Sequence, residues 1–197
     1  QDLIVALSAT ITITITIITT ATTTIIAIMT HLAFSLRFGK LRQSVIGQYF
    51  LNLKGAFYAL KYLPSHMNDG ASIVYTGSVA GSGLTHAGTG VYAASKAGGA
   101  YLARTSAIEN APRGIRVNCV CPALIAGTGM MVDDDGGDEA VFLSKLNAFG
   151  RMGKQDEVVG IYSFLASDAS TFITGQEICV DGGMSAGLGL PLFQAIG

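Results

Sequence analysis

Short apolar segments alternate with helix-like segments over most of this 197-residue chain, and most of them end beside glycine or proline. Period-2 or wholly apolar runs indicate strands at 72–76, 115–121 and 177–180. Apolar residues at helical spacing indicate helices at 45–63, 92–110 and 156–166. This alternation is typical of a parallel sheet with helices on both faces. We therefore expect an α/β fold, a doubly wound parallel sheet in three layers.

The composition fits buried parallel strands and excludes some partners. Half of the residues are hydrophobic, 13% are charged, and 25 are glycine. The net charge of −1 gives no sign of a nucleic-acid partner. Cys119, Cys121 and Cys179 lack metal-ligand spacing and lie in strand-like contexts, which favours reduced, buried thiols and a cytoplasmic location.

Residues 1–41 differ from the rest of the chain. Isoleucine and threonine alternate at 11–17 with the period of a strand, in a segment of low complexity. No charged residue occurs from Leu3 to Thr30, so a membrane span has to be considered, but the threonine content favours a strand. We expect one domain over 1–197, with an irregular or truncated N-terminal part, a regular part at 42–185 and an apolar tail at 186–197.

Three side chains in the regular part can interconvert a ketone and an alcohol. Tyr92 and Lys96 are four residues apart, so they share one face of a helix. A nearby ammonium lowers the pKa of a phenol and makes it a better proton donor and acceptor near neutral pH. Ser78 follows a strand and can hold the substrate oxygen. Hydride transfer also requires a carrier that amino acids cannot supply, which implies a nicotinamide cofactor.

The spacing of Tyr92 and Lys96 is common by itself, and a surface tyrosine beside a solvated lysine is the ordinary interpretation. The order of the neighbouring features favours the catalytic one. A strand leads to Ser78, a glycine-rich loop follows at 77–90, and the pair opens the next helix. In open parallel sheets, ligands bind beyond the carboxyl ends of the strands, where Ser78 and Pro122 would both lie.

These residues resemble the short-chain dehydrogenase/reductase family in its single-domain, Rossmann-like form, from about Val45 to Ser185. The resemblance implies that Ser78, Tyr92 and Lys96 are catalytic, and that Asn52 is the family's active-site asparagine, which holds a helix kink and a proton-relay water. Five further segments match the family in order: 116–122, 150–153, 164–168, 173–176 and 180–183.

The resemblance also implies a binding site for the nicotinamide end of NAD or NADP. Tyr92 and Lys96 would contact the cofactor, and the loop after the 115–121 strand would add Pro122, Ala123, Ile125 and Thr128. The family has Pro-Gly where this chain has Pro122-Ala123. Its threonine lies five residues after the proline, whereas here that position is Gly127, followed by Thr128.

The family's glycine-rich phosphate loop has no counterpart in the first part of the chain, because no glycine precedes Gly39. We therefore assign no phosphate-binding residue and do not choose between NAD and NADP. This feature keeps a second hypothesis open: a non-catalytic, family-like fragment or pseudoenzyme that binds a partner or self-associates.

The remaining implications concern the substrate, the assembly and metals. A family member of this type takes a small-molecule alcohol or ketone and forms a homodimer or homotetramer by pairing long helices. The acidic stretch at 133–139 lies in the family's substrate lid, and its spacing does not fit a calcium loop. We interpret it as a solvated loop and predict no metal site.

Overall fold

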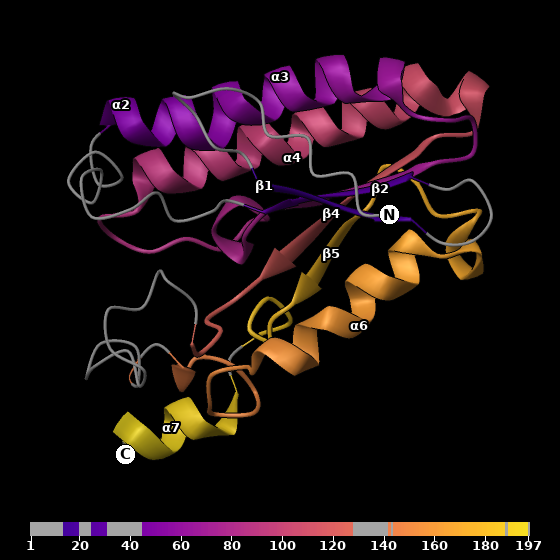
Figure 1. The fold of residues 1–197 in the computed structure, drawn as a ribbon. Coiled ribbons are helices and arrows are strands. Elements are labelled where there is room, and N and C mark those ends of the chain that lie inside the picture. Colours follow the sequence, from indigo (N-terminus) through magenta and orange to yellow (C-terminus); the bar gives the residue numbers. More distant parts are fainter. Residues whose placement is uncertain are drawn as a thin grey trace.

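The computed structural model describes residues 14–19, 25–30, 45–127, 142, 144–187 and 189–196. Within these residues the chain forms a five-stranded sheet of order β1-β2-β3-β4-β5 (Figure 1). The strands are β1 (Thr14–Thr19), β2 (Ile25–Thr30), β3 (Ser72–Thr76), β4 (Arg116–Pro122) and β5 (Glu177–Val180). Strands β2 to β5 run parallel, whereas β1 is antiparallel to β2. The sheet is thus parallel from β2 to β5, and its edge strand β1 runs in the opposite direction.

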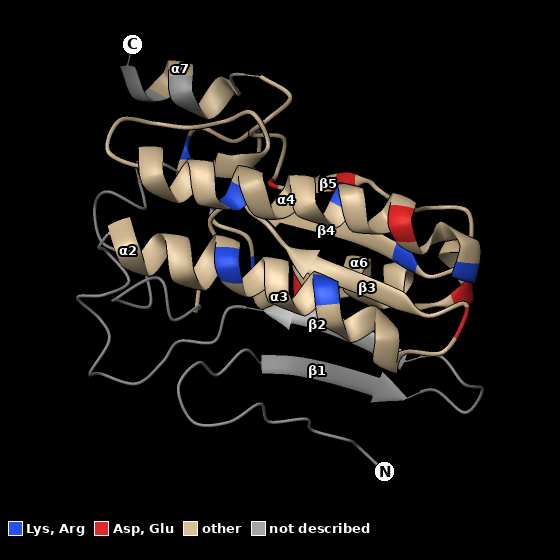
Figure 2. Cartoon of the chain, turned by 90° about the horizontal axis from the view of Figure 1, so that it is seen from above, with Lys and Arg blue, Asp and Glu red and all other residues tan. Residues whose placement is uncertain are grey.

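Helices cover both faces of the sheet, as expected for a doubly wound α/β fold (Figure 1). The helices are α2 (Val45–Gln48), a π-helix η1 (Tyr49–Lys54), α3 (Gly55–Tyr62), α4 (Gly90–Asn110), α6 (Gln155–Ala166) and α7 (Leu190–Ile196). The described residues also include four short 3-10 helices, η2 (Leu63–His66), η3 (Val79–Gly81), η4 (Ala111–Arg113) and η5 (Asp168–Ser170). Figure 2 shows α3 and α4 side by side over β3 and β4, and α6 lies on the opposite face.

The two faces are packed differently. The face under α3 and α4 carries a large apolar cluster that includes Ile73, Tyr75 and Val117, all without exposed surface. The α6 face carries a smaller cluster built on Val74, Val120 and Leu165. Consecutive strand residues point to opposite faces, which is why Ile73 and Val74 belong to different clusters. The site described below lies at the carboxyl ends of β3 and β4, on the α4 side.

Glycine and proline set the ends of these elements where the sequence predicts them. Gly114 follows η4 in the left-handed region, with φ of 66°, and its N–H donates to Ala111 O over 2.9 Å. Pro122 differs slightly from expectation, since it is the last residue of β4 and pairs in register with Val180. The strand continues through the proline because its missing N–H is tolerated at a strand end.

The uncharged segment before residue 31 contributes strands β1 and β2 rather than a helix. Among the helices that the structure describes, none has the length and the apolar composition that crossing a membrane requires. The predicted apolar tail forms α7, whose Leu190 and Phe193 are exposed. The acidic stretch at 133–139 lies outside the described residues.

Candidate active site

Ser78 lies two residues beyond β3 and is held by the turn that follows it. Its backbone is extended, and its Oγ accepts a hydrogen bond from Ala80 N over 3.2 Å, which caps η3. Gly77 N donates to Val120 O over 2.7 Å, so the turn is tied to the neighbouring strand. The Ser78 side chain is buried and also hydrogen-bonds the Tyr92 side chain. The hydroxyl and the phenol expected to hold one substrate oxygen are therefore in contact.

Helix α4 presents Tyr92 and Lys96 toward this turn. Lys96 is only 5% exposed, and its Nζ donates to Thr76 O, the last residue of β3, over 3.1 Å. The same Nζ lies 5.9 Å from the ring centroid of Tyr92 and 5.9 Å from that of Tyr75. The ammonium thus lies within 6 Å of two aromatic ring centroids at the carboxyl end of β3.

Burial dominates the electrostatics of both side chains. It raises the pKa of Tyr92, and the hydrogen bond from Ser78 opposes that shift. Burial also lowers the pKa of Lys96 to about 8. The sequence predicts that Lys96 lowers the pKa of Tyr92, whereas the net shift of that pKa is upward. Tyr92 is consequently protonated at neutral pH, the form that donates a proton to a carbonyl oxygen.

Asn52 is positioned by the π-helix that joins α2 to α3. Its Nδ2 donates to Ser95 Oγ over 2.9 Å and to Gln48 Oε1 over 2.6 Å. Ser95 Oγ in turn donates to Tyr92 O over 2.8 Å. Single-turn π segments widen a helix locally and are frequent at functional sites. This hydrogen-bonded path joins the Asn52 side chain to the backbone of the tyrosine, and it contains the helix irregularity that the resemblance implied.

Tyr75 contacts the backbone of Asn52 from the core of the sheet. Its hydroxyl donates to Asn52 O over 3.4 Å, and its ring is wholly buried under α4. A Cβ at Gly99 would lie 2.2 Å from the Tyr75 hydroxyl oxygen, so only glycine leaves room for it. Neither Tyr75 nor Ser95 was among the expected site residues. The sequence could have indicated Ser95, because positions 92, 95, 96 and 99 lie on one face of a helix.

The residues expected to bind nicotinamide are brought to a second location nearby. Ala123 and Ile125 line a cavity of about 170 Å³ at the carboxyl ends of β4 and β5, together with Asp181 and Gly182. Ala123 N donates to Val180 O over 3.2 Å, and Ile125 forms a parallel bridge with Gly153. None of the four expected catalytic side chains lines this cavity.

Two of the residues expected to contact the cofactor, Pro122 and Thr128, are not among those that line the cavity. Pro122 ends β4 next to it, and Thr128 lies outside the described residues. The residues that are described fit the nicotinamide end of a dinucleotide. The Lys96 ammonium has three N–H donors, and one of them is taken up by Thr76 O. Two donors are left for the hydroxyls of a ribose.

Among the described residues, no group of three or more histidine, cysteine or acidic side chains is arranged to hold a metal.

Comparison with known families identifies the class to which this arrangement belongs. The sequence profile of the family described as enoyl-(acyl carrier protein) reductase matches residues 26–185. That match begins in β2 and includes β3, β4, β5 and α4. The chain belongs to the short-chain dehydrogenase/reductase family, and its fold is the α/β fold that the family resemblance implied.

Individual relatives agree with this assignment. The chain is 39% identical over 138 residues to a tropinone reductase homolog of Arabidopsis thaliana, covering 68% of this chain and 50% of that protein. It is 35% identical to meso-2,3-butanediol dehydrogenase of Serratia marcescens over 145 residues, covering 72% and 55% of the two chains. This chain therefore spans about half the length of the curated relatives it matches.

Solved structures give the same result for the fold. A short-chain dehydrogenase/reductase from Serratia marcescens matches with a TM-score of 0.67 at 35% identity, covering 72% of this chain and 56% of that one. A blue fluorescent protein from a metagenomic library, solved in complex with NADPH, matches with a TM-score of 0.68 at 28% identity. That match covers 79% of this chain and 62% of the other.

Proposed function

We propose that this chain is an NAD(P)-dependent oxidoreductase that interconverts a secondary alcohol and a ketone, with Tyr92 as the acid and base. The observation that carries the proposal is the contact between the Ser78 and Tyr92 side chains beside the buried ammonium of Lys96. The alcohol dehydrogenases among the family's relatives, such as the butanediol enzyme, support a small alcohol or ketone as substrate.

In this proposal, the ketone oxygen accepts hydrogen bonds from Ser78 and Tyr92. Both hydroxyls lie beyond the carboxyl end of β3, where an open parallel sheet binds its ligands. The raised pKa of Tyr92 keeps its proton available at neutral pH, and the phenol donates that proton to the substrate oxygen during reduction. A bound nicotinamide supplies or accepts the hydride. In the oxidation direction, Tyr92 takes the hydroxyl proton back.

Lys96 and Asn52 have supporting roles in the same scheme. Lys96 donates to Thr76 O at the end of β3, and its remaining donors are placed to hold the ribose of the cofactor. Asn52 reaches the tyrosine through Ser95, which fixes the backbone at Tyr92. The four groups are thereby held before a substrate arrives, and that preorganisation favours proton transfer.

We place the nicotinamide end of NAD or NADP between Lys96 and the loop after β4. Tyr92 and Lys96 would contact the ribose, and Pro122, Ala123, Ile125 and Thr128 would contact the nicotinamide and its carboxamide. The cavity at Ala123 and Ile125 supports this placement. The free thiols of the three cysteines support a reducing, cytoplasmic setting.

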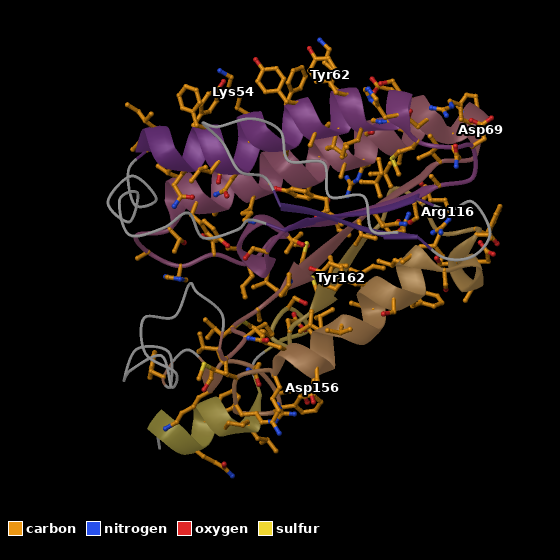
Figure 3. All side chains as sticks on the ribbon, viewed as in Figure 1. Lys54, Tyr62, Asp69, Arg116, Asp156 and Tyr162 are labelled. Atoms are coloured by element: carbon orange, nitrogen blue, oxygen red, sulfur yellow. The ribbon has the colours of Figure 1, made fainter. Side chains whose placement is uncertain are left out.

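We propose further that the chain forms a homodimer or homotetramer through its long helices. The outer faces of α2, η1, α3 and α4 expose large apolar and aromatic side chains, which are costly to leave in water as a contiguous set. They are Val45, Ile46, Tyr49, Phe50, Phe57, Tyr58, Tyr62, Tyr101 and Ile108. Figure 3 shows Tyr62 pointing away from the sheet. Light scattering on the purified chain would report a single subunit if this face is not an interface.

The second candidate function is a non-catalytic binding module, and one observation favours it. No glycine precedes Gly39, so residues 1–38 contain no counterpart of the glycine-rich loop with which the family binds the pyrophosphate. Such a module would keep the Ser78–Tyr92 contact without binding a dinucleotide. The two functions therefore differ in the first step, cofactor binding.

A calorimetric titration with NADH and with NADPH separates the two candidates. We expect saturable binding of one of them, weakened in Lys96→Met because the ribose loses its ammonium contact. Lys61→Met is the matched control, since this lysine lies on α3 and stacks on the exposed rings of Phe57 and Tyr62. Failure of both dinucleotides to bind a folded preparation would overturn the enzymatic proposal and favour the binding module.

A further inference from the structure

Two thiols that the proposed reaction does not use lie directly beneath the catalytic turn. Cys119 and Cys121 are alternate residues of β4, so their side chains share one face of the strand. Their Sγ atoms are 3.5 Å apart, and each residue is 1% exposed. β4 is paired on both sides, with β3 and β5, which fixes the spacing of the two thiols.

The pair is in contact with the backbone that positions Ser78. A Cβ at Gly77 would lie 2.6 Å from Cys119 Sγ and 2.9 Å from Cys121 Sγ, so the sulfurs occupy the space beneath that glycine. Gly77 N also donates to Val120 O, the residue between the two cysteines. Any atom bound between the sulfurs must therefore press on the residue that precedes Ser78.

Hydrogen bonds join Cys121 to Cys119 and to the turn that follows β3. Its sulfur accepts hydrogen bonds from the Cys119 thiol, from the Ser78 backbone N–H and from the Ser82 hydroxyl, and these lower the pKa of Cys121. The pKa of Cys119 is raised by the same hydrogen bond and by burial, while the Lys96 ammonium opposes that rise.

The geometry selects among the reactions open to a dithiol. A disulfide usually joins Cα atoms about 5.5–6 Å apart, whereas two residues of extended strand span about 6.4–6.8 Å, at the upper end of the range that disulfides reach. A paired central strand resists that contraction. By contrast, two sulfurs bound to one tetrahedral centre with bonds of ~2.3 Å lie about 3.8 Å apart. The observed 3.5 Å is close to that bridged separation.

The number of sulfur ligands further restricts which metal or metalloid this pair can bind. Zinc in a structural site takes four ligands, and the described residues offer no group of three potential metal ligands here. A monosubstituted trivalent arsenic centre needs two thiolates and carries its own organic group as the third substituent. We propose that Cys119 and Cys121 form a dithiol site that captures one such trivalent arsenical and thereby displaces the Gly77–Ser78 turn.

The capture step is balanced and involves no oxidant. An organoarsenic oxide, R–As=O, reacts with the two thiols to give R–As bound to both sulfurs and one molecule of water. Two As–S bonds form, the As–O bond breaks, and the two thiol protons leave with the oxygen. The loop at 81–90 is half-buried to exposed and contacts Cys121 through Ser82, so we place the route of access at this loop. Local opening of such a loop requires far less free energy than global unfolding.

Phenylarsine oxide is the probe that tests this site on the intact, reduced chain. Intact mass spectrometry is expected to show one phenylarsenic group per chain, with Cys119 and Cys121 protected from iodoacetamide in peptide maps. A small dithiol should remove the group, whereas a monothiol at equal concentration should not. Because a second bond within the same site adds about 10²–10⁴-fold in affinity, Cys119→Ser and Cys121→Ser should each weaken retention by that factor.

The third cysteine provides the matched control. Cys179 of β5 pairs in register with Cys121, and its Sγ donates a hydrogen bond to Ser82 Oγ over 3.6 Å. Cys179→Ser is expected to keep the adduct. Retention of the adduct by the Cys119→Ser variant, or protection of Cys179 in the wild-type map, would overturn the assignment. Absence of an adduct on folded wild-type chain that labels fully in urea would also overturn it.

The consequence for catalysis rests on the proposed function, whereas the adduct does not. Displacement of Ser78 is expected to abolish hydride transfer in the arsenical-bound chain, and the small dithiol should restore it. If the adduct forms at Cys119 and Cys121 but an active preparation loses no activity, the predicted displacement of the turn is wrong. If the chain has no activity before treatment, the proposed function fails while the mass result still tests the site.

Discussion

Two buried cations lie on opposite faces of the sheet, and their environments differ. Arg116 of β4 faces α6, where its guanidinium donates to Leu165 O, Ser167 O and Ser170 Oγ. Lys96 of α4 faces the other way, donates to Thr76 O and lies near two aromatic rings. Figure 3 shows Arg116 between the sheet and the chain that follows α6. The arginine donates three hydrogen bonds to protein acceptors, whereas the lysine donates one.

The difference separates a structural use of charge from a functional one. Buried charges cost free energy unless they are fully hydrogen-bonded. Burial lowers the pKa of both groups, and Lys96 falls to about 8. Arg116 offsets this cost by joining β4 to the end of α6. Lys96 has less compensation, so part of its cost persists in the folded protein. Such an uncompensated charge is expected where a side chain is reserved for chemistry.

The largest effect is expected from removing the structural cation. Arg116→Met should destabilise the fold by about 3–5 kcal/mol, because buried carbonyl and hydroxyl oxygens lose charged donors. Arg104→Met is the control: its side chain is 50% exposed and pairs with Glu177 at the surface, so its loss should cost less than about 1 kcal/mol. Urea unfolding measures both. Equal midpoints for the two variants would show that Arg116 does not hold α6.

The opposite sign is expected at Lys96. Lys96→Met removes a poorly compensated charge and should stabilise the fold at pH 7 by at most roughly 3 kcal/mol. The folded pKa of about 8 lies below the ordinary value of 10.5, so the unfolded chain binds more protons between these values. Wild-type stability should therefore rise from about pH 8 to 10, and the variant should lose that rise. A wild-type stability that falls over this interval would contradict the account.

The smallest effect compares the packing of the two faces. Val117 and Val120 are both wholly buried on β4, the first in the cluster under α3 and α4, the second under α6. Val117→Ala should cost about 2–3 kcal/mol and Val120→Ala about 1–2 kcal/mol. The second site borders partly buried side chains of α6, which can relax into the space. A larger loss for Val120→Ala would reverse the ranking of the two faces.

The sequence predicts most of the fold because its boundaries are chemical. Gly77, Pro112 and Gly114 stop elements by their backbone preferences, and the strands and helices between 72 and 122 lie within two residues of expectation. The sequence does not predict the direction of β1, because alternating isoleucine and threonine fit a parallel or an antiparallel strand equally well. The π-helix was implied only through Asn52, since its apolar spacing resembles that of an ordinary helix.

The candidate site was predicted in its residue types but not in its electrostatics. Ser78, Tyr92 and Lys96 follow from order and spacing, and Ser78 and Tyr92 are in contact. The direction of the Tyr92 pKa was wrong, because burial depends on packing that distant segments provide. Tyr75 was missed for the same reason. Its role depends on the space over Gly99, and no local pattern encodes that space.

The rate of hydride transfer in Tyr92→Phe tests the central claim most directly. General acid–base catalysis contributes about 10²–10⁴-fold, and we expect the rate to fall by that factor while the dinucleotide still binds. Tyr101→Phe, on the same helix but 66% exposed, should keep the wild-type rate. A wild-type rate in Tyr92→Phe, measured on an active preparation, would show that another group carries the proton.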